Sequence, residues 1–383
     1  MIGGKIINPI RQLAEQGKLS GLIIIVLTLV SLLLSNFPMT TAYVEFWQSH
    51  LAIMDYDVSV IHIINDGLMV VFFLMIGMEI KRELYVGELA NRRNAMLPVI
   101  AAFGGMIVPA IIYAVLNIKD THLLHGWAIP TATDIAFSLG VLSMLGKRVP
   151  FALKIFLTAL AIIDDLGAII IIALFYTEPE NFHLSFLISS LVIIGALMFL
   201  SRKGFFNLFL WIIASIVIWY FMLLSGVHTT IAGVLIAFTI PLNKLVSFEN
   251  KLHIPVNFFI LPVFALANTA IVLSLDNVSG LFSTVGLGVG FGLLIGKPLG
   301  ITAASWIAVK YKWCSLPGKI NLKLIFGAGL TAGIGFTMSI FIASLSFKEP
   351  LLLDSAKIAI IAGSVLSGIA DALFLKSNFK EIS

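Results

Sequence analysis

Residues 159–173 read Ala-Leu-Ala-Ile-Ile-Asp-Asp-Leu-Gly-Ala-Ile-Ile-Ile-Ile-Ala, an apolar run that contains two adjacent acids, Asp164 and Asp165. The run is apolar enough to lie in a lipid bilayer, where one ionisable side chain costs roughly 2.5–3.5 kcal/mol on the mildest insertion scale. Two neighbouring carboxyl groups cost more, because each makes the other harder to ionise. Such a pair is expected to serve cations or protons; the alternative is a buried pair with a structural role only.

The composition excludes a soluble globular protein. Of the 383 residues, 59% are hydrophobic and only 11% are charged, whereas soluble domains carry about 25% charged residues. Apolar stretches recur along the whole length, so the sequence predicts an all-α polytopic membrane protein, with residues 1–383 forming a single transmembrane transporter domain. The polar start, Met1 to Ser20, lacks a signal-peptide cleavage site, so the first apolar run is expected to be retained. The single cysteine, Cys314, excludes an internal disulfide and offers no metal cluster.

Windows of about 20 apolar residues are long enough to cross the hydrocarbon core as helices. The sequence predicts twelve such spans, and the boundary between the seventh and eighth rests on the short segment Leu224-Ser225-Gly226 alone. The predicted spans are residues 19–36, 59–80, 95–116, 124–145, 151–176, 183–200, 205–222, 224–240, 254–274, 284–309, 324–346 and 356–375.

The loop charges test this count. With loops assigned alternately to the two sides, 19 of the 24 basic residues fall on the side of the N-terminus and three on the other, with Lys154 and Lys297 inside spans. Cytoplasmic loops of membrane proteins carry an excess of Lys and Arg, so both termini are predicted to be cytoplasmic. The basic net charge of +4 is therefore loop charge, and no nucleic-acid partner is expected.

Two spans carry signs of a broken helix. Span four contains Pro130-Thr-Ala-Thr-Asp134, which suits an extended break whose hydroxyl and carbonyl groups line a cavity. Asp134 then opens the second half-helix, where its charge meets the positive helix end; a simple N-cap is the plainer interpretation. Span eleven contains residues 327–337 with four glycines. Because the triplets 95–176 and 284–375 each have the disrupted helix in the middle, the sequence predicts inverted three-helix repeats with crossing broken helices.

Lys297 stands about thirteen residues from either end of span ten, roughly 20 Å at helical rise. A lysine side chain is too short to reach the membrane surface from there, so it needs a carboxylate partner, and the buried aspartates are the obvious ones. A lysine that only holds helices together is the alternative. Asp66 and Asp371 also lie near or within apolar segments, and spacing alone assigns no role to either.

Several long segments of the chain closely resemble the NhaA family of bacterial sodium/proton antiporters. The likeness runs from Asn65 to the last span, and the segments that carry it are residues 128–140, 153–157, 161–168, 294–300 and 333–341. The resemblance implies a secondary active transporter, not an enzyme, that exports cytoplasmic Na⁺ or Li⁺ in electrogenic, pH-regulated exchange for external protons. It implies a bacterial inner membrane and a homodimer; the segment 43–57 corresponds to an extracellular hairpin used for dimerisation. No cofactor is expected.

The resemblance also implies the site. Asp165 is the principal ion-binding carboxylate, with Asp164 beside it, Lys297 as the salt-bridge partner of Asp164, and Thr133 and Asp134 at the crossing of the broken helices. The same resemblance implies a pH-sensing cluster of Glu79, Arg82, Glu83, Glu249, His253 and His228; a hydrogen-bonded structural histidine is the alternative for His228, and a solvated helix end for residues 79–83. Asn250 departs from the resemblance, since it stands where one member of the family has a histidine.

The chemistry that these residues predict is one site with two exclusive occupants. Sodium is a hard cation that favours oxygen ligands, and Asp164, Asp165, Thr133 and freed backbone carbonyls supply oxygens. A carboxyl group away from water holds its proton more tightly, so a proton and Na⁺ compete for it. Two alternatives remain: a sodium-coupled organic anion carrier of the same fold, and an intramembrane aspartyl protease, whose Gly-x-Gly-Asp signature is absent.

Overall fold

The computed structural model describes residues 3–37, 41–53, 56–144, 149–177, 182–318 and 320–378, and helices make up most of them. The chain forms two compact units. Unit 1 comprises Met1–Asn36, Gly87–Ala168 and Ile271–Ser383, and unit 2 comprises Phe37–Val86 and Ile169–Ala270. Lys147, Arg148, Lys319 and Lys380, which count toward the predicted orientation, lie outside the described residues.

Nine helices of the described residues are long and apolar enough to cross a membrane, or ten with one bent pair. The polytopic helical fold is therefore confirmed. At the other two predicted spans, 124–145 and 224–240, the structure has shorter elements: a short turn-rich segment followed by α7 (Ile135–Met144), and α11 (Thr230–Thr239). Twelve crossings and inverted repeats remain predictions.

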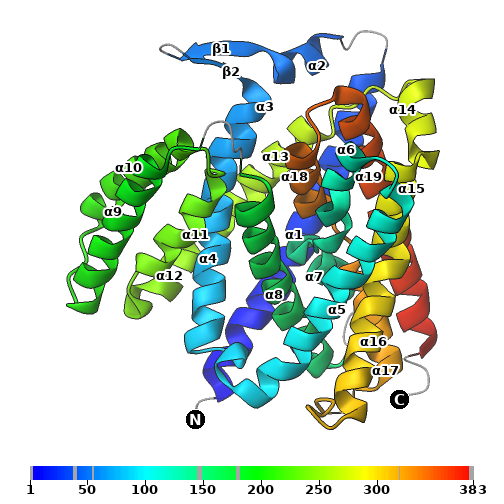
Figure 1. Ribbon diagram of the computed structural model, residues 1–383. Helices are drawn as coiled ribbons and strands as arrows, with labels where there is room; N and C mark the ends of the chain where they lie inside the picture. Colours follow the sequence, from blue (N-terminus) through cyan, green and yellow to red (C-terminus); the bar gives the residue numbers. More distant parts are fainter. Residues whose placement is uncertain are drawn as a thin grey trace. The chain divides into compact units, whose positions relative to one another are not determined.

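Unit 1 holds the first helix, the predicted triplet 284–375, and the triplet 95–176 as far as Ala168. Figure 1 labels the helices of these segments and colours them by position in the chain. In the second triplet a helix pair is bent by 52° between Ala332 and Phe336, which confirms the predicted break in span eleven. The helices of unit 1 are α1 (Gly3–Asn36), η2 (Glu88–Ala90), α5 (Arg92–Asn117), α6 (Thr121–Leu124), η3 (His125–Thr131), α7, α8 (Phe151–Phe175, which passes into unit 2 after Ala168), α14 (Leu275–Ser279), η7 (Gly280–Phe282), α15 (Thr284–Phe291), η8 (Gly292–Gly296), α16 (Lys297–Lys310), α17 (Leu322–Ala332), α18 (Phe336–Ser346) and α19 (Pro350–Asn378).

Unit 2 contains helices and one antiparallel hairpin, in which His50 pairs with Ser59. The hairpin confirms a turn-back in the segment 43–57 and adds two strands to a chain predicted to be all-α. The elements of unit 2 are α2 (Thr41–Gln48), β1 (His50–Ile53), β2 (Tyr56–Ser59), α3 (Val60–Ile63), η1 (Ile64–Leu68), α4 (Met69–Tyr85), α9 (Leu184–Arg202), α10 (Leu208–Ser225), α11, α12 (Leu242–Pro255), η6 (Val256–Ile260) and α13 (Leu261–Asn268).

Small residues let α5 and α16 run against each other in unit 1. A Cβ on Gly104 would collide with the carbonyl oxygen of Gly300 and lie 2.5 Å from the Cβ of Ala304. Gly296, at the end of η8, packs in the same way against Pro109, whose Cα lies 2.8 Å from where a Cβ would be. Backbones that approach so closely are typical of helix packing in membranes. The packing fixes the position at which α16 begins.

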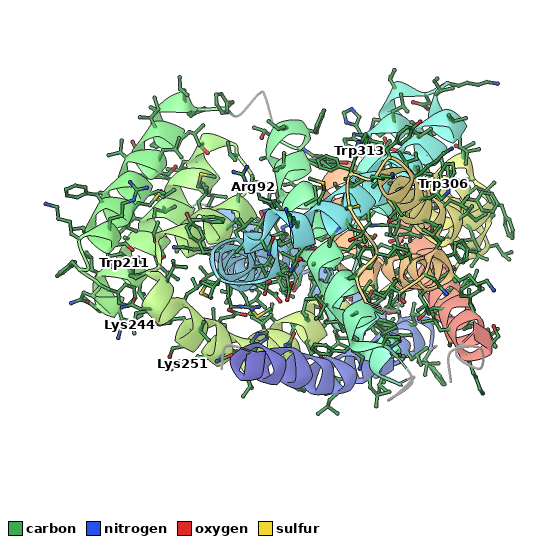
Figure 2. All side chains as sticks on the ribbon, turned by 90° about the horizontal axis from the view of Figure 1, so that it is seen from below. Arg92, Trp211, Lys244, Lys251, Trp306 and Trp313 are labelled. Carbon is green, nitrogen blue, oxygen red and sulfur yellow. The ribbon has the colours of Figure 1, made fainter. Side chains whose placement is uncertain are left out.

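Each unit contains basic and aromatic side chains in contact that suit a membrane interface. In unit 1, Lys310 lies over the Trp306 ring, 4.6 Å from its centroid, and Tyr311 stacks on Trp313; Figure 2 shows both tryptophans. In unit 2, Lys251 lies over the ring of Phe248 on α12. Aromatic and basic side chains concentrate where a membrane helix meets water.

Two of the predicted boundaries were wrong. The helix predicted for 254–274 begins at Leu242 and ends at Asn268, because its first turns are polar and an apolar window does not register them. The span predicted for 59–80 continues as α4 to Tyr85, so Lys81, predicted to lie in a loop, is inside the helix. Its side chain is 7% exposed.

Candidate functional site

The adjacent aspartates of α8 are both buried, with Asp164 1% and Asp165 2% exposed. Adjacent positions on a helix point about 100° apart, so the two carboxyl groups leave α8 in different directions. Helix α5 packs closely beside them, since a Cβ on Gly167 would collide with the sulfur of Met106.

Lys297 is fully buried and forms an ion pair with Oδ2 of Asp164. It follows the π-helical turn η8 and is the first residue of α16; single π-turns inside α-helices are frequent at functional sites. Pro298 comes next, at the one part of a helix where a missing N–H costs little. The predicted partnership between Lys297 and a buried aspartate is therefore present in the structure, and the partner is Asp164.

Thr133 joins this pair from an extended segment between η3 and α7. Its Oγ1 lies 2.6 Å from Oδ2 of Asp164 and 2.9 Å from the carbonyl oxygen of Ala332, and it accepts a hydrogen bond from Nζ of Lys297 at 2.8 Å. A hydroxyl has one hydrogen to donate. Thr133 therefore serves either Asp164 or Ala332 at a given moment, and its oxygen lies where two broken segments of unit 1 meet.

Asp134 links the two half-helices that begin at this crossing. Its Oδ1 accepts the N–H of Phe137 in α7 at 2.9 Å, and its Oδ2 accepts the N–H and the hydroxyl of Thr337 in α18 at 3.1 and 2.5 Å. Its own N–H donates to the carbonyl oxygen of Ile334 at 2.8 Å. A single carboxylate thus faces the positive ends of both half-helices, where negative charge is stabilised.

Asp165 completes the group. Its charge acts on the ammonium of Lys297, so the three ionisable groups form one electrostatic unit. The oxygen donors of this region are two carboxylates, the Thr133 hydroxyl and the carbonyls at the break, a set that suits a hard monovalent cation. Among the described residues, no three His, Cys, Asp or Glu side chains converge as they do in transition-metal sites.

Comparison with known proteins agrees with this geometry. The family described as "Na+/H+ antiporter 1" matches residues 11–375. The chain belongs to this antiporter family. It is 48% identical to "Na(+)/H(+) antiporter NhaA" of Flavobacterium psychrophilum, over 98% of each chain. It is 44% identical to the protein of that name from Cytophaga hutchinsonii, over 98% of this chain and 97% of the other. It is 46% identical to the protein of that name from Dechloromonas aromatica, over 94% of this chain and 93% of the other.

In this antiporter-family chain, five of the six residues expected to sense pH lie together in unit 2. Arg82 is the centre: its Nε lies 3.0 Å from Oε2 of Glu249, and its other nitrogens lie 2.6 Å from Glu83 and 3.8 Å from Glu79. His253 lies one helical turn after Glu249, with Nε2 3.8 Å from Oε1. The alternative of a solvated helix end does not hold for Glu79, which is 5% exposed.

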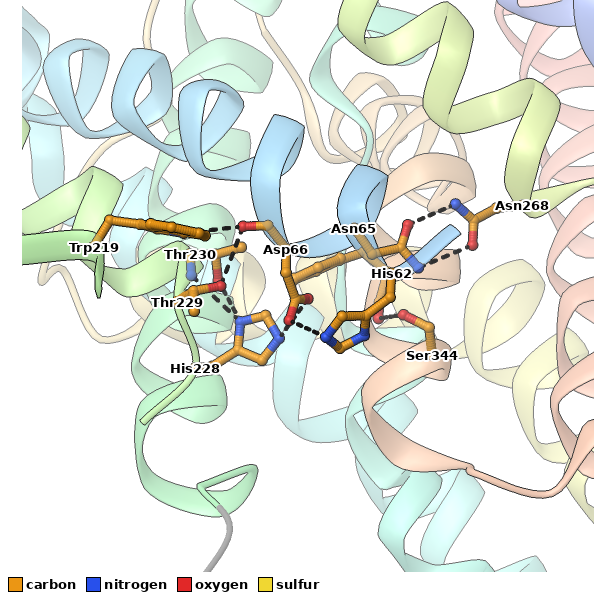
Figure 3. A network of polar contacts seen from close by, with 10 residues as sticks. His62, Asn65, Asp66, Trp219, His228, Thr229, Thr230, Asn268 and Ser344 are labelled. Carbon is orange, nitrogen blue, oxygen red and sulfur yellow. Dashed lines mark hydrogen bonds and ion pairs between the residues drawn. The ribbon is translucent and has the colours of Figure 1, made fainter. Parts of the chain in front are cut away.

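His228, the sixth residue, belongs to a separate network of the antiporter-family chain (Figure 3). Its Nε2 lies 3.6 Å from Oδ1 of Asp66, and its Nδ1 lies 2.8 Å from the Thr230 hydroxyl. On the other side of the carboxylate, Nε2 of His62 lies 3.2 Å from Oδ2. The sequence assigned no role to Asp66, and the structure places it between two histidines.

Sequence reasoning missed two further polar contacts of the antiporter-family chain. Asn268 donates to Oδ1 of Asn65 at 2.8 Å (Figure 3). Each asparagine lies in a largely apolar segment, and that position was the sequence feature from which a polar contact could have been predicted. Lys81 donates to the carbonyl oxygens of Phe238 and Ile240 at 2.7 and 2.5 Å, at the end of α11. Cations are stabilised at that end of a helix, and no sequence pattern links residues so far apart.

Proposed function

We propose that this protein exchanges Na⁺ for H⁺ across a membrane, with Asp165 and Asp164 as the binding carboxylates and Thr133 as a further oxygen ligand. The family membership and the names of the relatives, all of them Na⁺/H⁺ antiporters, support sodium/proton antiport. The observation that carries the site assignment is the ion pair of Lys297 with Asp164, fully buried and with Asp165 beside it.

Charge balance explains why the exchange is coupled. Two ionised aspartates and one lysine leave a net charge of minus one on three buried side chains. Either a proton on Asp165 or a Na⁺ between the carboxylates brings the group to neutrality. The empty form keeps an uncompensated buried charge, which costs several kcal/mol. Occupied forms therefore cross between the two sides much more readily than the empty form, and one cation is exchanged for another.

The Lys297 ammonium is a second reason why the site binds one cation at a time. Its ammonium already binds Oδ2 of Asp164 and the Thr133 hydroxyl, the atoms that a sodium ion would use. A cation that enters repels the ammonium and competes for both oxygens. Sodium binding therefore requires the Lys297–Asp164 ion pair to open, so the pair and the bound cation exclude each other.

The arrangement of Asp134 favours a cation exchanger over an organic anion carrier. Such a carrier would place its anion at the N-termini of the half-helices. In unit 1 the N–H groups of Phe137 and Thr337 already bind the Asp134 carboxylate. Antiporters of this family are transporters, so the protease alternative is not supported.

The finer features of the function rest on the sequence. The charge asymmetry of the loops supports both termini in the cytoplasm, and the bacterial relatives support an inner-membrane location. Transport of Li⁺ beside Na⁺, electrogenic exchange, regulation by pH and a homodimer formed through the β1–β2 hairpin are proposed from the family resemblance. Ten apolar spans together with the broken element around α7 and the shorter helix α11 support twelve crossings.

A proton-flux assay in membrane vesicles tests the proposed function. Vesicles that contain the protein are acidified inside, and Na⁺, Li⁺ and K⁺ are added in turn. We expect Na⁺ and Li⁺ to release protons and K⁺ to have little effect. Asp165→Asn should abolish the response while the purified protein keeps its melting temperature. Normal exchange by that variant would refute the site assignment.

A further inference from the structure

A further buried acid of unit 1, Asp371, lies outside the exchange site, on the last helix. Helix α19 carries a polar stripe made by Ser364, Ser367 and Asp371, spaced three and four residues apart and therefore on one helix face. All three side chains are at most 1% exposed. Serines are common where membrane helices pack, but a buried ionisable residue such as Asp371 is by default a candidate for function.

The stripe faces the break between α17 and α18. Ser364 accepts the N–H of Phe336, the first residue of α18, at 3.2 Å. Ser367 lies against Gly333, where a Cβ would be 2.7 Å from its hydroxyl oxygen. Asp371 lies beside Thr331 in the last turn of α17. Its neighbours are therefore the residues that form the broken helix.

The contacts around Asp371 do not fit an ionised carboxylate. Neither carboxyl oxygen makes a hydrogen bond within the described part of the chain, and neither does the Ser367 hydroxyl. The Thr331 hydroxyl interacts with the acid but donates to the carbonyl oxygen of Gly327 at 3.2 Å. The acid also lies beside the C-terminal turn of α17, where the partial charge of the helix is negative and a second negative charge is disfavoured. A buried ion without partners costs several kcal/mol.

Charged groups on the neighbouring elements do not compensate Asp371 either. Among the described residues, no titratable side chain of α19 or of the helices packed against it acts electrostatically on this carboxyl group. The residues in question are Asp276 of α14, Lys323 of α17, Lys297 after η8, Asp134 before α7, and Asp354, Lys357 and Lys376 of α19 itself.

The turn beside Asp371 is also bound to the exchange site. The carbonyl oxygen of Thr331 accepts the hydroxyl of Ser138 at 3.0 Å, and that of Ala332 lies 2.9 Å from Oγ1 of Thr133. Thr133 shares its one hydrogen between Ala332 and Asp164. A cation that takes the Asp164 and Thr133 oxygens therefore changes the bonding of the same turn that packs on Asp371.

We infer that Asp371 is a second proton-binding carboxyl group of this transporter, neutral in the conformation described and deprotonated in another step of each cycle. The step is the simple release of H⁺ from the carboxylic acid to water, when the α17–α18 break rearranges and lets water reach it. The inference rests on the proposed exchange function. Asp371 on α19 would carry one transported proton in addition to the proton that competes with Na⁺ at Asp165.

The test compares Asp371→Asn with wild type in the full-length protein. The amide has the size of the neutral acid, so the fold and melting temperature should be kept. We expect the ratio of protons to sodium ions, measured from charge movement in proteoliposomes, to fall by one proton per Na⁺. Asp354→Asn, on the same helix, should leave the ratio unchanged. An unchanged ratio in Asp371→Asn would overturn the inference.

An infrared difference spectrum separates this inference from the proposed function. With pH raised at fixed Na⁺, the wild type should lose the carbonyl band of a protonated acid, and Asp371→Asn should lack that component. If Asp371→Asn does not fold, Thr331→Val, which removes the one hydroxyl that interacts with the acid, should shift the frequency of the band. A band that is absent in wild type, or that Na⁺ removes at constant pH by occupying the acid, would contradict the proton assignment. Absence of exchange in wild type would instead refute the proposed function.

Discussion

Lys297 of α16 and Asp164 of α8 form an ion pair in which neither side chain is exposed, and Thr133 hydrogen-bonds to both. Three segments far apart in the sequence meet at these atoms. A buried pair gains strength from its low-dielectric surroundings, and each partner becomes costly when the other is removed.

The first prediction concerns this pair. Lys297→Met should destabilise the protein by about 3–5 kcal/mol, because it leaves the Asp164 charge buried alone. The double variant Lys297→Met with Asp164→Asn should recover most of that loss. Melting temperatures in detergent check the prediction, and equal losses in the single and double variants would show that the pair contributes no coupling energy.

A second prediction concerns Thr133 as an ion ligand. Thr133→Val keeps the shape of the side chain and removes its oxygen, so the apparent Na⁺ affinity should fall by about tenfold, the equivalent of about 1.4 kcal/mol. Thr133→Ser keeps the oxygen and should bind Na⁺ nearly as well as wild type. Sodium titrations of proton flux measure both, and a valine variant with wild-type affinity would remove Thr133 from the site.

The close packing of α5 on α16 predicts a sensitive glycine. Gly104→Ala would push α16 away from α5 and should cost about 1–3 kcal/mol, and it should slow exchange because α16 begins at Lys297. Gly290→Ala is the matched control, since nothing lies within 4 Å of the added methyl group. Thermal unfolding and flux should distinguish the two; similar behaviour would mean that this contact does not position Lys297.

The Arg82 cluster predicts opposite pH shifts from opposite substitutions. Arg82→Gln removes the cation that favours the ionised form of Glu79, so Glu79 should keep its proton to higher pH and half-maximal exchange should move to more alkaline pH. Glu79→Gln removes one of the competing acids and should move it to more acidic pH. Flux profiles from pH 6 to 9, in steps of about 0.5, are the measurement, and shifts in the same direction would contradict pH regulation through this cluster.

The sequence predicts those parts of the fold that follow from the free-energy cost of burying a charged or polar group in an apolar span. An apolar span with a charge in the middle must find a partner, so Lys297 and the aspartate pair are recognisable, and a proline with two threonines before Asp134 predicts a break. The α12 turns from Leu242 were missed because their polar residues resemble a loop. The π-turn η8 has no periodic signal, and the contact of Lys81 with Phe238 depends on tertiary packing alone.

Sodium affinity as a function of pH tests the central claim, that H⁺ and Na⁺ exclude each other at Asp165 and Asp164. Calorimetric titration of the purified protein with NaCl measures it directly. When one proton competes with one Na⁺, the apparent Kd should rise about tenfold for each unit that the pH falls below the titration of the site. Asp165→Asn should show no sodium binding at any pH. A Kd that stays constant from acidic to alkaline pH would contradict the account.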